Sequence, residues 1–186
     1  MALEATFRSL SVNLRKLRDT LNAVLLTVGD RPPEPGAALA DGLENAVLDL
    51  IGTLEEARPA ANAATKAVGP AKDLDRARRA LARCQHLFHD VEQSFSKELV
   101  SYEKLRNLAS LGNSRGGEWK HWAASMKDAI EQARQPIDET SKSLATCWHE
   151  LAEHSGNTSI SIRTQNVGQQ THLSRNLDRV GIPSNG

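Results

Sequence analysis

The chain has 186 residues, 23 basic and 23 acidic side chains, and two cysteines. That length is typical of one domain with room for a tail. Zero net charge excludes a global basic field that would draw the protein to nucleic acid or anionic lipid. No apolar run approaches the ~20 residues that cross a bilayer, and the N-terminus shows no apolar core of a secretory signal. Two cysteines do not make a disulfide framework, so we expect a reducing compartment, the cytoplasm.

Composition divides the chain near its C-terminal end. Every alanine, the strongest helix former, lies within residues 1–154, whereas residues 155–186 have none. The later segment carries three basic residues and one acidic residue. This shift predicts a helical body over 1–154 and a weakly structured, non-helical tail over 155–186.

The first predicted helix covers residues 3–28. Its apolar residues recur at alternating steps of four and three, which places them on one helix face. Gly29 and the proline-rich run 31–36 end it, because proline lacks a donor and disfavours helix before itself. The apolar positions are Leu3, Phe7, Leu10, Leu14, Leu17, Leu21, Val24 and Val28.

The second predicted helix covers residues 38–68 and ends at Gly69–Pro70. Pro59 lies inside it and predicts a kink or a split. The segment 60–67 is so rich in alanine that we expect a close approach to a neighbouring helix there. The apolar stripe is Leu39, Leu43, Val47, Leu50, Leu54, Ala57, Ala61, Ala64 and Val68.

The third predicted helix covers residues 73–111, with Asp73 as its N-cap, since a carboxylate there accepts from free backbone N–H groups. Glycines 112, 116 and 117 mark its end. Its apolar stripe is Leu74, Ala77, Leu81, Cys84, Phe88, Val91, Phe95, Leu99, Tyr102, Leu105 and Ala109.

The fourth predicted helix covers residues 118–154, with Pro136 as a second expected kink. Its stripe is Trp119, Trp122, Met126, Ile130, Ala133, Ile137, Thr140, Leu144, Cys147 and Leu151. Four long stripes joined by short turns predict an all-α, antiparallel up-down-up-down four-helix bundle. Narrow stripes leave packing across a homo-oligomer open.

The two cysteines fall at similar distances from the turn between the last two helices at residues 114–115, about 30 residues before it and about 32 after it. We therefore expect Cys84 and Cys147 at the same level of the bundle, as small buried side chains. The alternative is a Cys/His metal or redox sensor, which needs both cysteines and two nearby histidines to converge. A di-metal carboxylate site needs two Glu-x-x-His motifs, and the chain has only Glu118 to His121. We expect no metal and no cofactor.

One short motif resembles the HEPN ribonucleases, which are helical bundles with Arg, four to six residues, then His. Arg83 to His89 has that spacing, and so does Arg115 to His121. The resemblance implies a site built from two copies across a dimer. The polar residue that usually follows the arginine in that family is Cys84 in one match and Gly116 in the other.

Partner binding is predicted at the end of the bundle where the last two helices turn. The first helix is shorter than the last two, so their tip is expected to overhang and expose a partner-binding surface. The alternative is that the first loop or a shifted first helix covers this tip. Its apolar residues are Leu108, Leu111, Trp119 and Trp122.

The tail supplies two further interaction elements. Residues 158–167 alternate like a strand, with Ile160, Ile162 and Val167 available to pair with a partner's sheet edge. Leu173, Leu177 and Val180 then follow steps of four and three, as in a short amphipathic helix. We therefore interpret the chain as a non-catalytic interaction module, an accessory, adaptor or regulatory subunit of a larger protein assembly, rather than a HEPN-like enzyme using Arg83 and His89.

Overall fold

The computed structural model describes residues 2–32, 37–69, 72–114 and 116–155. Within these ranges the chain is helical and contains no strand, which confirms the all-α class. The predicted tail elements, in residues 156–186, lie outside the described residues. The elements in chain order are α1 (Ala2–Gly29), α2 (Ala37–Val68), α3 (Leu74–Ser94), the π-helical turn η1 (Phe95–Leu99), α4 (Tyr102–Ser114) and α5 (Gly116–His154).

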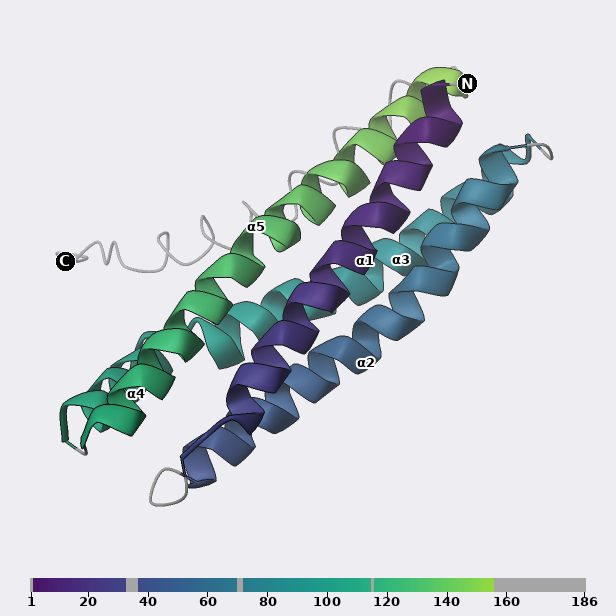
Figure 1. The fold of residues 1–186 in the computed structure, drawn as a ribbon. Helices are drawn as coiled ribbons and strands as arrows, with labels where there is room; N and C mark the ends of the chain where they lie inside the picture. The colour runs from purple at the N-terminus through teal and green to yellow at the C-terminus, as the bar shows by residue number, and fades with distance from the viewer. Residues whose placement is uncertain (1, 33–36, 70–71, 115, 156–186) are drawn as a thin grey trace, which may run out of the picture.

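The helices form an antiparallel up-down-up-down bundle within one chain (Figure 1). Helix α1 packs between α2 and α5, α2 packs on α3, and α4 packs on the first part of α5. Helix α3, η1 and α4 together make the third rod. The contact of α5 with α3 is much smaller than its contacts with α4 and α1, so this side of the bundle is less closed along α3 than along α4.

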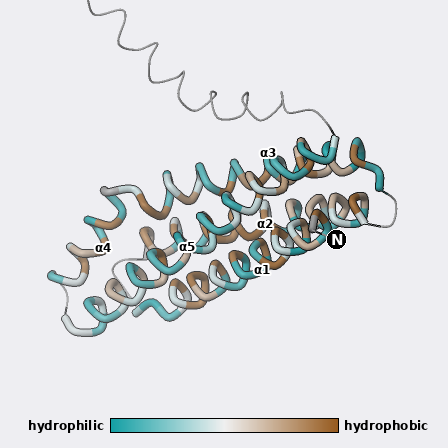
Figure 2. Tube along the Cα trace, turned by 90° about the horizontal axis from the view of Figure 1, so that it is seen from above, coloured by the Kyte–Doolittle hydropathy of each residue, from teal (hydrophilic) through white to brown (hydrophobic). Residues whose placement is uncertain are grey.

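The predicted apolar stripe of α1 is confirmed residue by residue. All eight positions from Leu3 to Val28 are buried, and seven of them are fully inaccessible. Hydrophobic segments of the helices face one another inside the bundle, and hydrophilic segments face outward (Figure 2). Burial of this stripe, together with those of the other helices, supplies most of the driving force for the fold.

Both helices with an internal proline run through it without splitting. Helix α2 continues past Pro59, so of the two alternatives predicted there, a kink or a split, the split does not occur; α5 also continues past Pro136. The alanine-rich part of α2 does approach α1 closely. The Thr65 hydroxyl donates to the backbone carbonyl of Phe7, at 3.3 Å from Oγ1 to O, which a short side chain reaches only between adjacent helices.

The third rod begins as predicted. An Asp73 carboxylate oxygen accepts from the backbone N–H of Arg76, at 2.9 Å, which confirms the N-cap. Its later part departs from the single regular helix expected over 73–111. Chain geometry widens to a π-turn at η1, where the Val100 N–H donates to the Phe95 carbonyl at 3.2 Å.

This irregular turn shifts the apolar register of α4. Leu108 is buried and Ala109 is exposed, so the predicted burial of Ala109 is wrong. A π-turn adds one residue to a helical turn and so rotates the following helix relative to the stripe before it. Leu105 and Leu111 are half-buried and, with Leu108, face α5 at a three-residue spacing.

Candidate interaction groove between α3 and α5

A groove of about 900 Å³ lies between α3 and α5, on the side where these helices make least contact. Its walls come from most of α3 and from the last part of α5. The lining residues are Arg78, Ala82, Gln85, His86, Phe88, His89 and Glu92 from α3, and Ser141, Leu144, Ala145, Thr146, Trp148, His149, Leu151 and Ala152 from α5.

Small side chains along one flank of α5 keep the groove open. Ser141, Ala145, Trp148 and Ala152 recur at steps of four and three, so they share one helix face beside the buried stripe. Three of these four side chains are too short to reach α3. The facing flank of α3 likewise includes Ala82. The groove therefore follows from side-chain size at particular positions, and not from a break in either helix.

The floor of the groove is apolar. Phe88, Leu144 and Leu151 belong to the buried core and also line the groove. Trp148 is half-buried, and its indole N–H donates to the side-chain carbonyl of Gln85, at 2.6 Å from Nε1 to Oε1. This hydrogen bond joins the two walls and fixes the ring between them. A large aromatic ring held in a concave apolar surface is typical of interface anchors.

Ionisable pairs line the rims. His86 lies 3.2 Å from Asp90, and His149 lies 3.2 Å from Glu153, each pair one helical turn apart on its own helix. Arg78 forms an ion pair with Asp75 at 3.2 Å, while its other terminal nitrogen, Nη2, is buried without a hydrogen-bond partner among the described residues. The groove thus has an apolar floor, mixed charges at its rims and one unused buried donor.

The cysteines lie beneath this surface, in the core. Both are free and buried. Burial raises the pKa of Cys84 to about 12. The pKa of Cys147 also rises to about 12, mainly through burial, with smaller contributions from the charges of Glu150 and Cys84. The two thiols therefore lie near each other, as expected from their shared level. They are protonated at neutral pH, so neither is an activated nucleophile.

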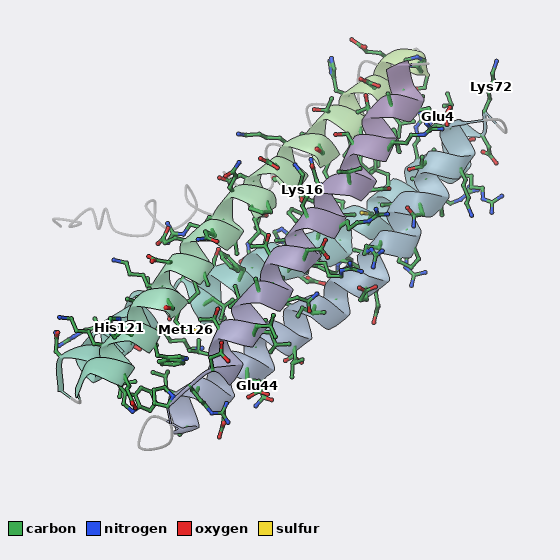
Figure 3. The ribbon with its side chains drawn as sticks, viewed as in Figure 1. Glu4, Lys16, Glu44, Lys72, His121 and Met126 are labelled. Carbon is green, nitrogen blue, oxygen red and sulfur yellow. The ribbon has the colours of Figure 1, made fainter. Side chains whose placement is uncertain are left out.

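Metal-ligating side chains do not cluster in the part of the chain that the structure describes: no three His, Cys, Asp or Glu residues are placed to hold one ion. His121, the histidine of the single Glu-x-x-His motif, is exposed at the end of the bundle formed by α4 and the start of α5 (Figure 3).

The tryptophans at that end are covered, which corrects the expectation of an exposed overhang. Trp119 and Trp122 are 4% and 5% exposed, Leu108 is buried and Leu111 is half-buried. The Trp122 indole N–H donates to the Thr27 carbonyl near the end of α1, at 2.8 Å. Helix α1 therefore extends far enough to cover the ring. Of the two alternatives that the sequence left open, an exposed tip and a covered tip, the structure has the covered one. The two rings pack edge to face, with centroids 5.2 Å apart.

The arginine and histidine of the HEPN-like spacing point to different surfaces. Arg83 lines a shallow pocket on the α2 side of α3. His89 lines the α3–α5 groove instead, and its Nδ1 lies 3.9 Å from Glu92. Six residues correspond to about 120° of net rotation on a helix, so one chain does not bring these side chains together. Arg115, from the second match, lies outside the described residues.

Comparison with protein families, with curated proteins and with solved structures finds no match to this chain. None of the helices described is both long and apolar enough to cross a membrane. The groove between α3 and α5 is therefore the feature of this chain that bears on its function. Sequence reasoning missed Trp148 and Gln85, although a tryptophan placed beside the stripe, among small residues at 141, 145 and 152, was a usable signal.

Proposed function

We propose that this protein is a non-catalytic interaction module, an adaptor or regulatory subunit that binds an amphipathic helix in the α3–α5 groove. The supporting observation is that the bundle is left open between α3 and α5, over an apolar floor, with Trp148 held across the opening by Gln85. A helix laid in a hydrophobic groove is a common mode of peptide recognition.

The chemistry of the groove describes its occupant. Phe88, Leu144 and Leu151 suit leucine-sized or valine-sized side chains at steps of three and four. Polar rims suit the solvent-facing side of the same helix. The unpartnered Nη2 of Arg78 suits a carbonyl or carboxylate acceptor at one end. These features favour a protein segment over a nucleotide or a metal ion.

Both cysteines are free thiols, which is consistent with a reducing compartment. We propose that the protein is located in the cytoplasm. The predicted strand of the tail, with Ile160 and Ile162, remains a second proposed element, one that pairs with a partner's sheet edge. Both elements are ways to join a larger assembly, and neither requires a cofactor.

A matched pair of variants tests the groove as the binding site. Ala145→Arg places a long side chain in the groove, while Ala124→Arg makes the same change at an exposed position of α5 outside it. Tagged full-length chains are used to capture proteins from the cells that make this protein. We expect Ala124→Arg to retain the partners of the unaltered chain and Ala145→Arg to lose them. Equal capture by both variants, or capture of nothing by the unaltered chain, contradicts the proposal.

A further inference from the structure

We infer that the α3–α5 groove is occupied in the free protein by the chain's own residues 171–180, which compete with a partner helix. This inference rests on the proposed function, because it names a second ligand for the same site. It makes the module self-masking: a partner must displace a segment of the same chain.

The described part of the chain ends at one end of the groove. Helix α5 finishes at His154, and two residues of its last turn, Leu151 and Ala152, line the groove. The following segment therefore starts at one end of the groove, beside Arg78 on the opposite wall. A further 31 residues, 156–186, follow from that point.

Residues 171–180 also have the length that the groove requires. Along α5 the groove extends from Ala152 back to Ser141, which is about 17 Å at 1.5 Å per residue. Residues 171–180 as a helix measure about 15 Å. A random-coil chain of the same number of residues as 156–170 has an end-to-end distance of about 20 Å. The segment therefore matches the groove, and its connection reaches any point along it.

The apolar residues of this segment recur at spacings that suit the groove floor. In the sequence THLSRNLDRV, Leu173, Leu177 and Val180 fall within about 60° on a helix, while Ser174, Arg175, Asp178 and Arg179 lie away from them. The three apolar side chains suit the floor formed by Phe88, Leu144 and Leu151. So short a helix is marginal alone in water, so docking and helix formation occur together.

Attachment to the same chain gives this segment an advantage over a partner. For short flexible linkers in general, the effective concentration of a tethered ligand is in the millimolar range. Weak intrinsic binding is then sufficient to fill the groove. A partner of equal intrinsic affinity binds only when its own concentration is comparable, so the segment sets a threshold for assembly.

The test uses a fluorescent synthetic peptide of residues 171–180 and the full-length protein. In Leu173→Ser/Leu177→Ser the apolar face of the chain's own segment is removed. Thr171→Ala/Ser174→Ala alters the same segment off that face and is the matched control. We expect the peptide to bind the Leu173→Ser/Leu177→Ser protein at least tenfold more tightly than it binds the unaltered protein or the control. Adding Ala145→Arg should abolish this binding.

Several outcomes overturn the inference. Equal peptide affinity for all three proteins means that the groove is not filled by this segment, and so does no binding to any of them. Binding that survives Ala145→Arg places the peptide elsewhere. Sedimentation showing a dimer that only Leu173→Ser/Leu177→Ser dissociates means exchange between copies instead. None of these results affects the capture experiment with Ala145→Arg and Ala124→Arg, so the proposed function fails or stands separately.

Discussion

Helix α5 makes two interfaces that differ in construction. Towards α1 it is closed by polar side chains that reach the neighbouring helix. Asn13 donates to the Ser143 hydroxyl at 2.7 Å, and the Thr6 hydroxyl donates to a carboxylate oxygen of Glu150 at 2.7 Å. Towards α3, small residues leave a groove that the hydrogen bond from Trp148 to Gln85 crosses. One helix with one buried stripe therefore has a side closed against α1 and a side left open towards α3.

The difference lies in the residues beside the stripe. Apart from Thr140, the residues of the stripe belong to the one hydrophobic core that both interfaces share. Positions such as Ser143 and Glu150 carry groups that bond to α1, whereas Ala145 and Ala152 on the other flank carry none. The residues beside the buried stripe thus determine whether α5 packs closely against a neighbouring helix or leaves a groove.

The largest expected effect is loss of core packing on the closed side. Phe7 is fully buried in α1, and Phe7→Ala should lower the free energy of unfolding by about 3–5 kcal/mol. Leu26, on the same helix, is 72% exposed, and Leu26→Ala should cost less than about 0.5 kcal/mol. Urea denaturation measures both. A cost below about 1 kcal/mol for Phe7→Ala would contradict the assigned core.

The buried thiols predict a loss of stability at alkaline pH. An unfolded cysteine ionises at about 8.5, whereas burial raises the pKa of Cys84 and Cys147 to about 12. A raised folded-state pKa means that their contribution is complete below pH ~8.5 and is lost as the pH rises towards 12. By pH 11 this loss amounts to roughly 3 kcal/mol per thiol.

The control for this pH effect is Cys84→Ala/Cys147→Ala. That variant should be less stable at pH 7, because it leaves cavities, yet its stability should fall less steeply above pH 8.5. Denaturation curves recorded from pH 7 to 11 compare the two proteins. Parallel declines would show that the thiols are not buried as described.

A smaller difference is expected between the polar contacts of the two interfaces. Asn13→Ala removes hydrogen bonds to Ser143 and to the Glu139 carbonyl, and should cost about 1–2 kcal/mol. Gln85→Ala should cost less than about 1 kcal/mol, because the half-buried Trp148 beside the open groove can find water instead. Thermal unfolding ranks the two variants. The reverse order would contradict the distinction between a closed and an open interface.

The smallest expected difference in stability is between two glycine-to-alanine changes, one at Gly52 in open space and one at Gly112 between α4 and α5. Gly52 lies in α2 with open space around it, so Gly52→Ala should stabilise the protein by about 0.5–1 kcal/mol through helix propensity. At Gly112 an added Cβ would lie 3.3 Å from the Cα of Lys120. Gly112→Ala should therefore gain less than Gly52→Ala, or lose stability. An equal gain would show that α4 and α5 are not closely packed there.

The sequence predicted the fold well because the signal for it is local and periodic. Leucines at steps of three and four identified the buried face of α1, and Asp73 marked the start of α3. The shift at Phe95–Leu99 was not predicted, since a π-turn changes register without any proline or glycine to signal it. Ala109 was therefore assigned to the wrong face.

The candidate site was harder to predict because it depends on which helices become neighbours. The pattern of stripes does not say that α3 and α5 stay apart while α1 and α5 close. Trp119 and Trp122 were predicted to be exposed, because they are large apolar residues at a tip, yet the end of α1 covers them. Trp148 was overlooked, and its position became meaningful only once Gln85 and Ala145 were found beside it.

The most direct measurement of whether the groove binds a polypeptide is photo-crosslinking in living cells. A photoreactive amino acid is placed at Ala145, inside the groove, or at Ala124, on the exposed surface of the same helix. We predict that the probe at position 145 crosslinks to a second polypeptide and to residues 171–180 of its own chain, while the probe at 124 does neither. Equal or absent crosslinking from the two positions would contradict the assignment of the groove as the binding surface.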